Sequence, residues 1–264
     1  MLDEKQNEVS LPSHIQCLKP FLAMEIMERA QQLEAAGKHI IHLEIGEPDF
    51  DTPLRIKEAC MRSLQETQPR YTHSLGLLEL REAICEHYFE KYGVVITPDR
   101  VVITSGTSPA MLLICSVLLN RGDEVILSDP HYPCYPNFLC YVGAQPLYVN
   151  VDEQDGFQYT VDKVTQVLTG NTKALIVNSP SNPAGTVISG KTLAEVVLGT
   201  EDEPRVAVQV DDGRRVGDRD ITRGLPAGSV EVLVRRIERN GEQRTRLPFE
   251  LDALALVVPD RGRA

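Results

Sequence analysis

The chain has 264 residues, of which 42% are hydrophobic and 25% are charged, as in an ordinary globular protein. Its formal net charge of −11 argues against nucleic acid or an anionic membrane as the main partner. No apolar run approaches the roughly 18 residues of a membrane span, and the acidic, polar N-terminus does not resemble a signal peptide. We therefore expect a cytoplasmic protein that binds neither membrane nor nucleic acid.

Helix and strand patterns alternate along most of the chain. Helical spacing or apolar, β-branched runs predict helices over 77–93, 109–120, 135–143 and 160–170, and strands over 100–106, 123–130, 146–151 and 173–180. Gly170 is expected to end the last of these helices. Such alternation predicts an α/β fold with a mainly parallel sheet and flanking helices. Ligands bind these sheets at the carboxyl ends of the strands, so the turns there are candidate sites.

The six cysteines are scattered and lack the CxxC spacing of metal or redox sites. They are Cys17, Cys60, Cys85, Cys115, Cys134 and Cys140. Cysteines of cytoplasmic proteins are usually kept reduced. We therefore expect six free thiols and no metal site.

The composition changes near residue 199. The last 64 residues contain 12 arginines, no lysine and a single aromatic residue, Phe249. Asn240 and Gly241 lie between two strand-like runs, which favours a hairpin turn. We expect this segment to be β-rich or disordered. It is either foreign to the rest of the chain, as an out-of-frame segment would be, or a native β-rich extension.

Residues 103–111, ITSGTSPAM, join a predicted strand to a predicted helix. Ser105, Gly106 and Thr107 would present backbone N–H groups and two hydroxyls at the helix N-terminus, where unpaired amides and the helix dipole favour phosphate. The alternative is an ordinary helix cap, because Ser and Thr are common there. The turn lacks both the GxGxxG and the GxxxxGK[ST] pattern, which disfavours a dinucleotide or P-loop site.

Two further turns follow later strands. In SDPHYPCYPNF, residues 128–138, the Tyr132 ring could stack on a planar ligand; alternatively, Tyr132 and Tyr135 pack over the sheet edge. His131 beside them is interpreted as a structural or solvent-facing residue. In NSPSNPAG, residues 178–185, prolines stiffen the loop and the Asn182 amide could bond a phenolic oxygen of a ligand. The alternative there is a plain proline-rich turn.

Together the three turns resemble, in order and spacing, those of the fold type I pyridoxal-phosphate enzymes, specifically class I/II aminotransferases related to aspartate and alanine aminotransferases. NSPSNPAG resembles the family's N-x-x-N-P-T-G turn, with Ala184 in place of threonine. SGTSPAM resembles its phosphate-binding turn, and PHYPCY its segment with a cofactor-stacking aromatic. LEIGEPDFDTP and RYTHSLGLLELREAI resemble two upstream motifs. The resemblance covers about residues 20 to 198.

This resemblance implies pyridoxal 5'-phosphate as the cofactor and amino-group transfer between an amino acid and a 2-oxo acid as the activity of intact relatives. The residues implied to bind the cofactor are Ser105, Gly106, Thr107, Tyr132, Asn182 and Tyr71. Tyr71 would reach the phosphate of the neighbouring subunit's cofactor, which implies a homodimer. Gly46 would line the substrate site.

Three groups that the family's chemistry needs lie after the Asn-Pro turn. They are an aspartate that pairs with the pyridinium nitrogen, a lysine that bonds covalently to the cofactor and then moves a proton, and an arginine that binds the substrate carboxylate. The chain has no lysine after Lys191, which follows Asn182 too closely for this role. Asp211 or Asp212 follows a strand-like run at about the right distance. An arginine replaces the tyrosine expected after it, and an acidic hairpin turn is the favoured interpretation.

We therefore expect the N-terminal part of an aminotransferase that binds pyridoxal phosphate and has no catalytic lysine. Residues 1–50 would form an N-terminal arm and part of a small domain, 51–198 an incomplete cofactor-binding large domain, and 199–264 an unrelated segment. Two alternatives are a non-catalytic module that binds the cofactor or a partner, and the inactive product of a truncated or frameshifted gene.

Overall fold

The computed structural model describes residues 12, 16–46, 49–66, 70–198, 206–211, 231–236 and 254–257. Its helices are α1 (Leu22–Ala35), α2 (Leu54–Glu66), α3 (Leu78–Tyr92), α4 (Thr107–Leu118), α5 (Tyr135–Val142), α6 (Val161–Val167) and α7 (Gly190–Leu198), with short 3₁₀ helices η2 (Pro98–Arg100) and η3 (Glu153–Asp155). Its strands are β1 (Val101–Ile103), β2 (Glu124–Asp129), β3 (Gln145–Asn150), β4 (Thr172–Asn178), β5 (Val206–Asp211), β6 (Glu231–Arg236) and β7 (Leu254–Val257). In this part of the chain, no helix is long and apolar enough to span a membrane.

The helices and strands predicted from residue 77 to residue 180 all form, with ends that move by at most three residues. The largest shift at a helix end concerns α6, which stops at Val167 and not at Gly170. Leu168 is already extended, with φ −63° and ψ 135°. The Thr169 N–H donates to the Thr172 hydroxyl at 3.0 Å. The hydrogen bond to the Thr172 side chain therefore ends the helix before Gly170.

The described strands form one seven-stranded sheet in the order β1-β7-β6-β5-β4-β2-β3. β2 pairs in parallel with both β3 and β4, β4 pairs in parallel with β5, and β1 pairs in parallel with β7. Only β6 runs against its neighbours. The mainly parallel sheet expected from the sequence is thus confirmed. Strands β5, β6 and β7 all come from the compositionally distinct segment after residue 198 and lie between β4 and β1.

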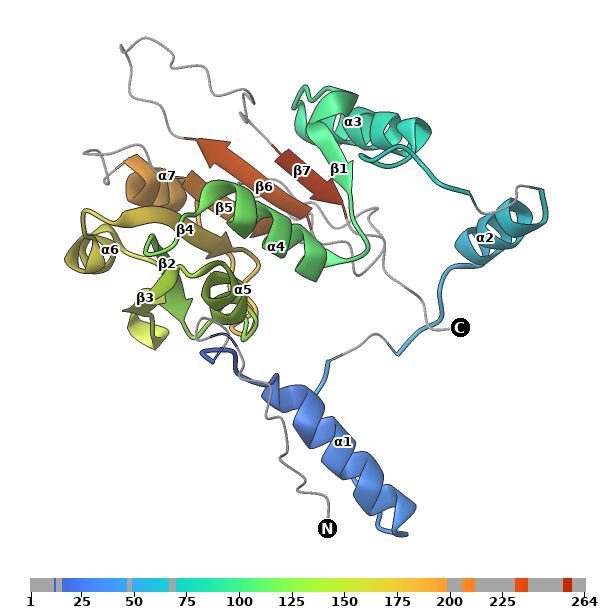
Figure 1. Cartoon of the computed structure of the whole chain (residues 1–264), viewed down its shortest axis with the longest axis horizontal. Helices are drawn as coiled ribbons and strands as arrows, with labels where there is room; N and C mark the ends of the chain where they lie inside the picture. The colour runs from blue at the N-terminus through green and yellow to red at the C-terminus, as the bar shows by residue number, and fades with distance from the viewer. Residues whose placement is uncertain are drawn as a thin grey trace, which may run out of the picture.

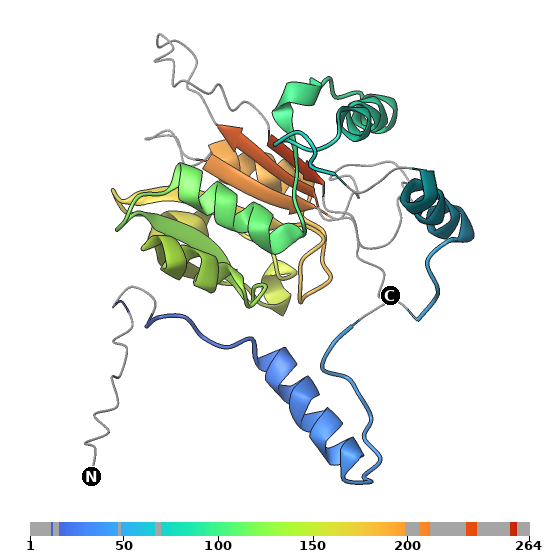
Figure 2. The same cartoon turned by 45° about the vertical axis from the view of Figure 1, so that its right-hand side comes forward.

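Helices cover both faces of this sheet because alternate strand residues point to opposite sides. Val125 and Leu127 of β2 belong to one buried cluster, which also contains residues of α4 and α5. Ile126, between them, belongs to a second cluster, which contains residues of α6 and α7. Figures 1 and 2 show these two helix pairs on either side of the strands. The runs of buried apolar residues in β2 and β4 are those of a sheet covered on both faces.

Helices α1 and α2 stand apart from the sheet in both views (Figures 1 and 2). Each exposes large apolar side chains, for example Leu22 of α1 and Leu54 of α2. Helix α3 instead packs beside β1, where Ile84 and Tyr88 join Val101 in a small buried cluster. The helices within residues 78–198 therefore pack against the sheet, whereas the first two helices do not.

The loop before α3 is fixed to the end of β1. The Ile103 N–H donates to the Leu75 carbonyl at 2.9 Å. The buried Arg81 donates from Nε to the Gly76 carbonyl at 3.2 Å and from Nη1 to the Pro98 carbonyl at 2.6 Å. Gly76 has φ +97°, and a Cβ there would lie 2.5 Å from Ile103 Cγ1. Residues of the RYTHSLGLLELREAI motif thus have a structural role, since only glycine fits against β1.

The expectation of six free thiols is wrong for two cysteines. Cys17 and Cys140 form a disulfide, with their Cα atoms 6.0 Å apart. The bond forms because residues 16–20 lie against α5, which brings two cysteines distant in sequence within disulfide range. The other four cysteines are free: Cys60, Cys85, Cys115 and Cys134.

Candidate functional site

The predicted site turns follow strands that end at one edge of the sheet, here called the carboxyl edge. Strands β1, β2, β4 and β5 run in the same direction, because β1 is parallel to β7 and two antiparallel pairings separate β7 from β5. The turns after β1, β2 and β4 therefore open on the same side, where α/β proteins bind ligands. This topology assembles segments that lie far apart in the sequence.

The first turn joins β1 to α4 through residues 104–106. Gly106 is the helix N-cap, with φ +125° and ψ 167°, and no side chain caps the helix. The Thr104 hydroxyl donates to the Gly106 carbonyl at 2.8 Å, and Ser105 is exposed. The first N–H groups of α4, including that of Thr107, thus have no side-chain acceptor at this cap. An uncapped helix N-terminus of this kind suits a phosphate or another anion.

The second turn carries Tyr132, which is half-buried between β2 and α5. Its ring meets the Tyr135 ring edge-on, with centroids 5.3 Å apart, and the Phe21 ring at 6.2 Å. Burial raises the pKa of the Tyr132 phenol well above its ordinary value, so the side chain is neutral at physiological pH. Tyr135 is buried in the core. The packing interpretation therefore holds for Tyr135, whereas Tyr132 keeps an accessible part.

His131 has contacts that favour the structural interpretation. Its Nδ1–H donates to the Ser128 carbonyl at 3.0 Å. Its ring stacks on that of Tyr148, with centroids 5.3 Å apart and an interplanar angle of 27°. A histidine held by a backbone carbonyl and an aromatic ring braces the turn after β2 and so supports the segment that carries Tyr132.

The third turn follows β4 and is closed by its own backbone. The Ser181 N–H donates to the Thr186 carbonyl at 2.8 Å, and the Gly185 N–H donates to the Ser181 carbonyl at 2.6 Å. In the amide orientation that lets both side-chain atoms form hydrogen bonds, Asn178 Nδ2 donates to the Pro180 carbonyl and Oδ1 accepts from the Asn182 N–H. Each distance is 3.0 Å. Asn182 itself is exposed at this turn. The first asparagine of the motif thus positions the second.

Two predicted residues lie away from these turns. Tyr71 is fully exposed in the loop before α3. Gly46 lies in the segment between α1 and α2, where an added Cβ would meet no described atom within 4 Å. No close neighbour in the described part of the chain therefore requires a glycine at position 46. The roles implied for both residues stay predictions.

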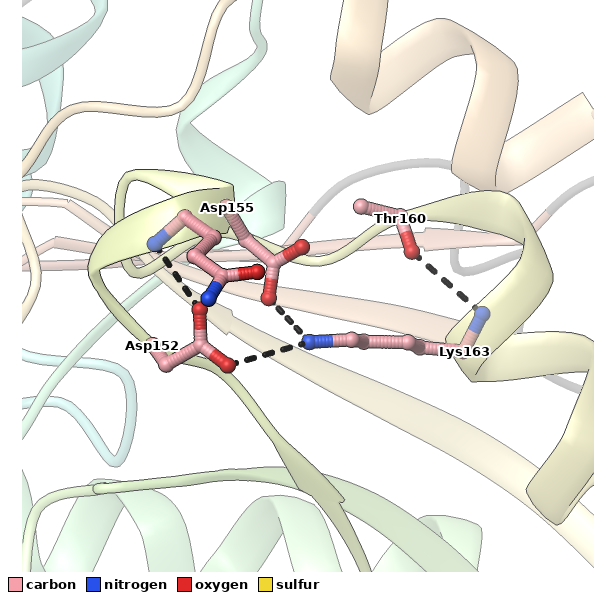
Figure 3. A network of polar contacts seen from close by, with 5 residues as sticks. Asp152, Asp155, Thr160 and Lys163 are labelled. Atoms are coloured by element: carbon pink, nitrogen blue, oxygen red, sulfur yellow. Dashed lines mark hydrogen bonds and ion pairs between the residues drawn. The ribbon is translucent and has the colours of Figure 1, made fainter.

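Lys163 is held by carboxylates on the connection between β3 and α6 (Figure 3). Its ammonium pairs with Asp155 and lies 3.7 Å from Asp152 Oδ2. The hydrogen bond that the Lys163 ammonium donates to Asp155 is the largest cause that raises the pKa of Lys163. Its backbone N–H donates to the Thr160 hydroxyl, which caps α6, at 3.3 Å. A protonated, paired amine of this kind is a poor nucleophile toward an aldehyde.

Lys191, the last lysine of the chain, lies on the first turn of α7. Its side chain is 85% exposed, and its ammonium lies 3.7 Å from Glu195 Oε1, one helical turn further on. This is the arrangement of a solvated surface lysine. It supports the interpretation that Lys191 does not bond to a cofactor.

Asp211 is the last residue of β5, the strand beside β4. Val210 pairs with Asn178, so the backbone of Asp211 reaches the carboxyl edge next to the third turn. The hairpin expected after it lies outside the described residues, as do Asp212 and the Asn240-Gly241 turn. The sequence favoured an acidic hairpin turn here because an arginine replaces the tyrosine expected after this residue, and a cofactor role for Asp211 stays a prediction.

Sequence analysis also missed Phe21, whose ring contacts Tyr132. No local pattern indicates this contact, because Phe21 lies more than 100 residues before its partner and belongs to no motif. The arrangement as a whole has an uncapped helix N-terminus, an aromatic ring and an exposed amide on one sheet edge. These groups suit the non-covalent binding of a planar, phosphorylated ligand.

The sequence pattern described as Aminotransferase class I and II matches residues 38–211. The match continues beyond residue 198, where the family resemblance was expected to end, and includes all of β5. The chain is 46% identical over 168 residues to the (5-formylfuran-3-yl)methyl phosphate transaminase of Methanocaldococcus jannaschii, covering 64% of this chain and 43% of that protein. It is 37% identical to the aspartate aminotransferase of Geobacillus stearothermophilus, covering 72% of this chain and 49% of that protein.

Solved structures give the same result. The aspartate aminotransferase from Thermus thermophilus with maleate superposes with a TM-score of 0.73 at 32% identity, covering 77% of this chain and 53% of that one. An aminotransferase from Mycobacterium tuberculosis superposes with a TM-score of 0.68 at 27% identity, covering 76% of this chain and 59% of that one. The chain thus spans about half the length of the curated relatives it matches.

Proposed function

Because the chain belongs to the class I and II aminotransferases, we propose that it binds pyridoxal phosphate without a covalent bond and does not itself transfer amino groups. Pyridoxal phosphate is the cofactor expected of this family. One observation carries the proposal: the three candidate turns lie at one edge of the sheet, whereas no lysine follows Lys191 among the 264 residues. The relatives are named for amino-group transfer, whereas for this chain the proposal covers only the binding of the cofactor.

Each turn has one role in this proposal. The N–H groups at Gly106 and Thr107 and the Ser105 hydroxyl bind the phosphate. The Tyr132 ring stacks on the pyridine ring, and the Asn182 amide donates to the phenolic oxygen. When bound, the cofactor supplies an electron-withdrawing ring, which is the chemistry that amino-group transfer uses. The residues described here orient that ring and leave it without a covalent tether.

Asp211 completes the cradle in this proposal. A carboxylate at the carboxyl edge beside β4 would pair with a protonated pyridine nitrogen and hold it charged. Two observations support the assignment: Asp211 ends a strand parallel to β4, and it falls within the family match. The assignment replaces the acidic hairpin as the favoured interpretation of this residue.

The substrate class and the assembly follow the relatives. We infer that the complete family site would accept an amino acid and a 2-oxo acid, with Gly46 lining the substrate position. The fully exposed Tyr71 is available to a second copy of the chain, which supports a homodimer. In the same way, we infer a cytoplasmic location and a division of the chain at residue 50.

The test is a titration of the full chain with pyridoxal phosphate, followed by borohydride reduction and mapping of the labelled lysines. We expect saturable binding, no stoichiometric label on any one lysine, and no amino-group transfer to 2-oxoglutarate. Lys163 should stay unlabelled because its amine is protonated and paired. One stoichiometric label with turnover would contradict the inactive assignment, and absence of saturable binding would contradict the cradle.

Replacing the stacking ring tests the geometry of the cradle. Tyr132→Leu should weaken binding about threefold to tenfold, the range expected for a lost ring–ring contact. Tyr141→Leu, an exposed tyrosine on α5, is the matched control and should bind as the unmodified chain does. Equal dissociation constants for the two variants would exclude Tyr132 from the site.

A further inference from the structure

An N-terminal arm, defined here as residues 16–21, is attached to α5 at two points. Cys17 is joined to Cys140 by the disulfide. Two residues further along, the Lys19 N–H donates to Asn137 Oδ1 at 3.0 Å, and Asn137 Nδ2 donates back to the Lys19 carbonyl at 2.7 Å. In Figure 1 the arm is the dark-blue segment beside α5, ahead of α1. One helix face thus holds the arm by a covalent bond and a reciprocal pair of hydrogen bonds.

The end of the arm touches the candidate cofactor site. Phe21, its last residue, is the N-cap of α1, and its ring lies 6.2 Å from that of Tyr132 at an interplanar angle of 69°. Tyr132 lies three residues before the start of α5. The segment that holds the arm is therefore continuous with the segment that carries the stacking ring.

The two cysteine residues differ in exposure. Cys17 is an exposed residue, whereas Cys140 is 7% exposed. A thiolate reagent therefore reaches the disulfide from the Cys17 side. The remaining Lys19–Asn137 hydrogen bonds are exposed and compete with water. Once the covalent bond is lost, the arm depends on non-covalent contacts such as these exposed hydrogen bonds and the Phe21–Tyr132 ring contact.

We propose that the Cys17–Cys140 disulfide is a redox-sensitive clasp that holds the N-terminal arm on α5 and thereby keeps Phe21 against Tyr132. In the oxidised chain the Tyr132 ring is braced from the arm side. In the reduced chain the arm leaves α5 and Phe21 withdraws. The link to ligand binding rests on the proposed function, because it takes Tyr132 to be part of the cofactor cradle.

Opening the clasp is a balanced thiol–disulfide exchange with a dithiol reductant. One thiolate of the dithiol attacks the Cys17 sulfur, the Cys17–Cys140 bond breaks, and Cys140 leaves as a thiolate that takes up a proton. The second thiol then displaces Cys17, and the reagent becomes a cyclic disulfide. Two electrons pass to the protein. A glutathione-buffered, reducing compartment would keep the clasp open, and an oxidising one would keep it closed.

Hydrogen–deuterium exchange of the full chain, without cofactor, tests the clasp directly. Oxidised and dithiothreitol-treated protein are compared peptide by peptide. Reduction should speed exchange of residues 16–22 about tenfold or more and of residues 130–136 to a smaller extent, while β2 and β4 stay unchanged. Equal exchange of residues 16–22 in the two states would overturn the proposal.

Two serine variants separate the clasp from general effects of thiol chemistry. Cys17→Ser should exchange like the reduced chain whether or not dithiothreitol is present. Cys60→Ser removes an exposed free thiol on α2 and should keep the full redox response. If Cys17→Ser exchanges like the oxidised chain, the hydrogen bonds alone hold the arm and the clasp is excluded.

The affinity for pyridoxal phosphate then tests whether the Phe21–Tyr132 contact affects the site. Oxidised protein should bind pyridoxal phosphate several-fold more tightly than reduced protein, and Phe21→Ala should abolish that difference while leaving the exchange response of residues 16–20 intact. Equal affinities in the two states would overturn the link between clasp and site. A chain that binds no cofactor in either state would refute the proposed function, and the exchange result would still decide the clasp.

Discussion

At the scale of single residues, Gly76 shows how a motif residue can act through packing. Its φ of +97° disfavours any side chain, and a Cβ would lie 2.5 Å from Ile103 Cγ1 on β1. We expect Gly76→Ala to lower the free energy of unfolding by about 2–4 kcal/mol, from backbone strain and overpacking together. Urea denaturation followed by circular dichroism measures this change.

Gly37 offers the matched control for this substitution. It also has a positive φ, +82°, but an added Cβ would meet nothing within 4 Å. Gly37→Ala should therefore report the backbone strain alone, about 1 kcal/mol. If both substitutions destabilise the chain equally, the contact with Ile103 contributes nothing and the loop before α3 is not fixed by it.

At the scale of elements, the pair of Lys163 with Asp155 ties the start of α6 to η3, the short helix after β3 (Figure 3). The hydrogen bond from Lys163 lowers the pKa of Asp155 below 3.8, and that from Asp155 raises the pKa of Lys163 above 10.5. The stabilisation that the ionised Asp155 contributes is thus fully present above pH 3.8. It is lost as the pH falls through the pKa that Asp155 has in the folded chain. The stabilisation that the protonated Lys163 contributes is fully present below pH 10.5. It is lost as the pH rises through the pKa that Lys163 has in the folded chain.

We therefore expect Lys163→Gln to raise the pKa of Asp155 toward 3.8 and to lower the melting temperature at pH 7. The difference in melting temperature should shrink as the pH falls through the folded pKa of Asp155, because protonation removes the charge that pairs with Lys163. Carboxyl NMR titration and thermal melts measure the two effects. Lys191→Gln removes an 85% exposed lysine paired within one helix and should change neither quantity. A pH-independent loss would mean that packing of the lysine stem dominates.

At the scale of the whole molecule, the sheet depends on strands after residue 198. Strand β1 pairs only with β7 among the described strands, and β4 pairs with β5. A chain that ends at residue 198 should therefore lose the partner of β1 and expose an unpaired edge of β4, which favours aggregation. Size-exclusion chromatography and thermal unfolding compare it with the full chain. A monomeric, equally stable 1–198 chain would support the division at residue 198 as a true domain boundary.

The elements between residues 77 and 180 could be predicted because their signals are local. Short apolar runs such as that of β2 stand between amphipathic or capped helices, and parallel topology then brings the three turns to one edge. The end of α6 was misplaced because a side-chain contact, Thr169 to Thr172, competes with the glycine signal. Such competition depends on geometry that the residue pattern does not contain.

The contacts of the N-terminal arm could not be predicted, because they join distant segments. The Cys17–Cys140 bond spans 123 residues, and cysteine spacing does not give connectivity. Phe21 likewise has no pattern that links it to Tyr132. The turns of the candidate site were visible in the sequence, whereas the residue that braces one of them was not.

The pairing of β1 with β7 also has a consequence for how the chain folds. Val101 pairs with Ala255, so β1 cannot form its strand pairing until β7, more than 150 residues later in the sequence, has been synthesised. During synthesis, β2, β3 and β4 can pair as soon as residue 178 has emerged, whereas β1 and α3 stay undocked until residue 257 follows. Pairings between such distant segments form slowly and leave partly folded chains exposed. A chaperone that binds exposed apolar side chains would therefore meet those of α3 and β1, such as Ile84, Tyr88 and Val101, before the sheet closes around them.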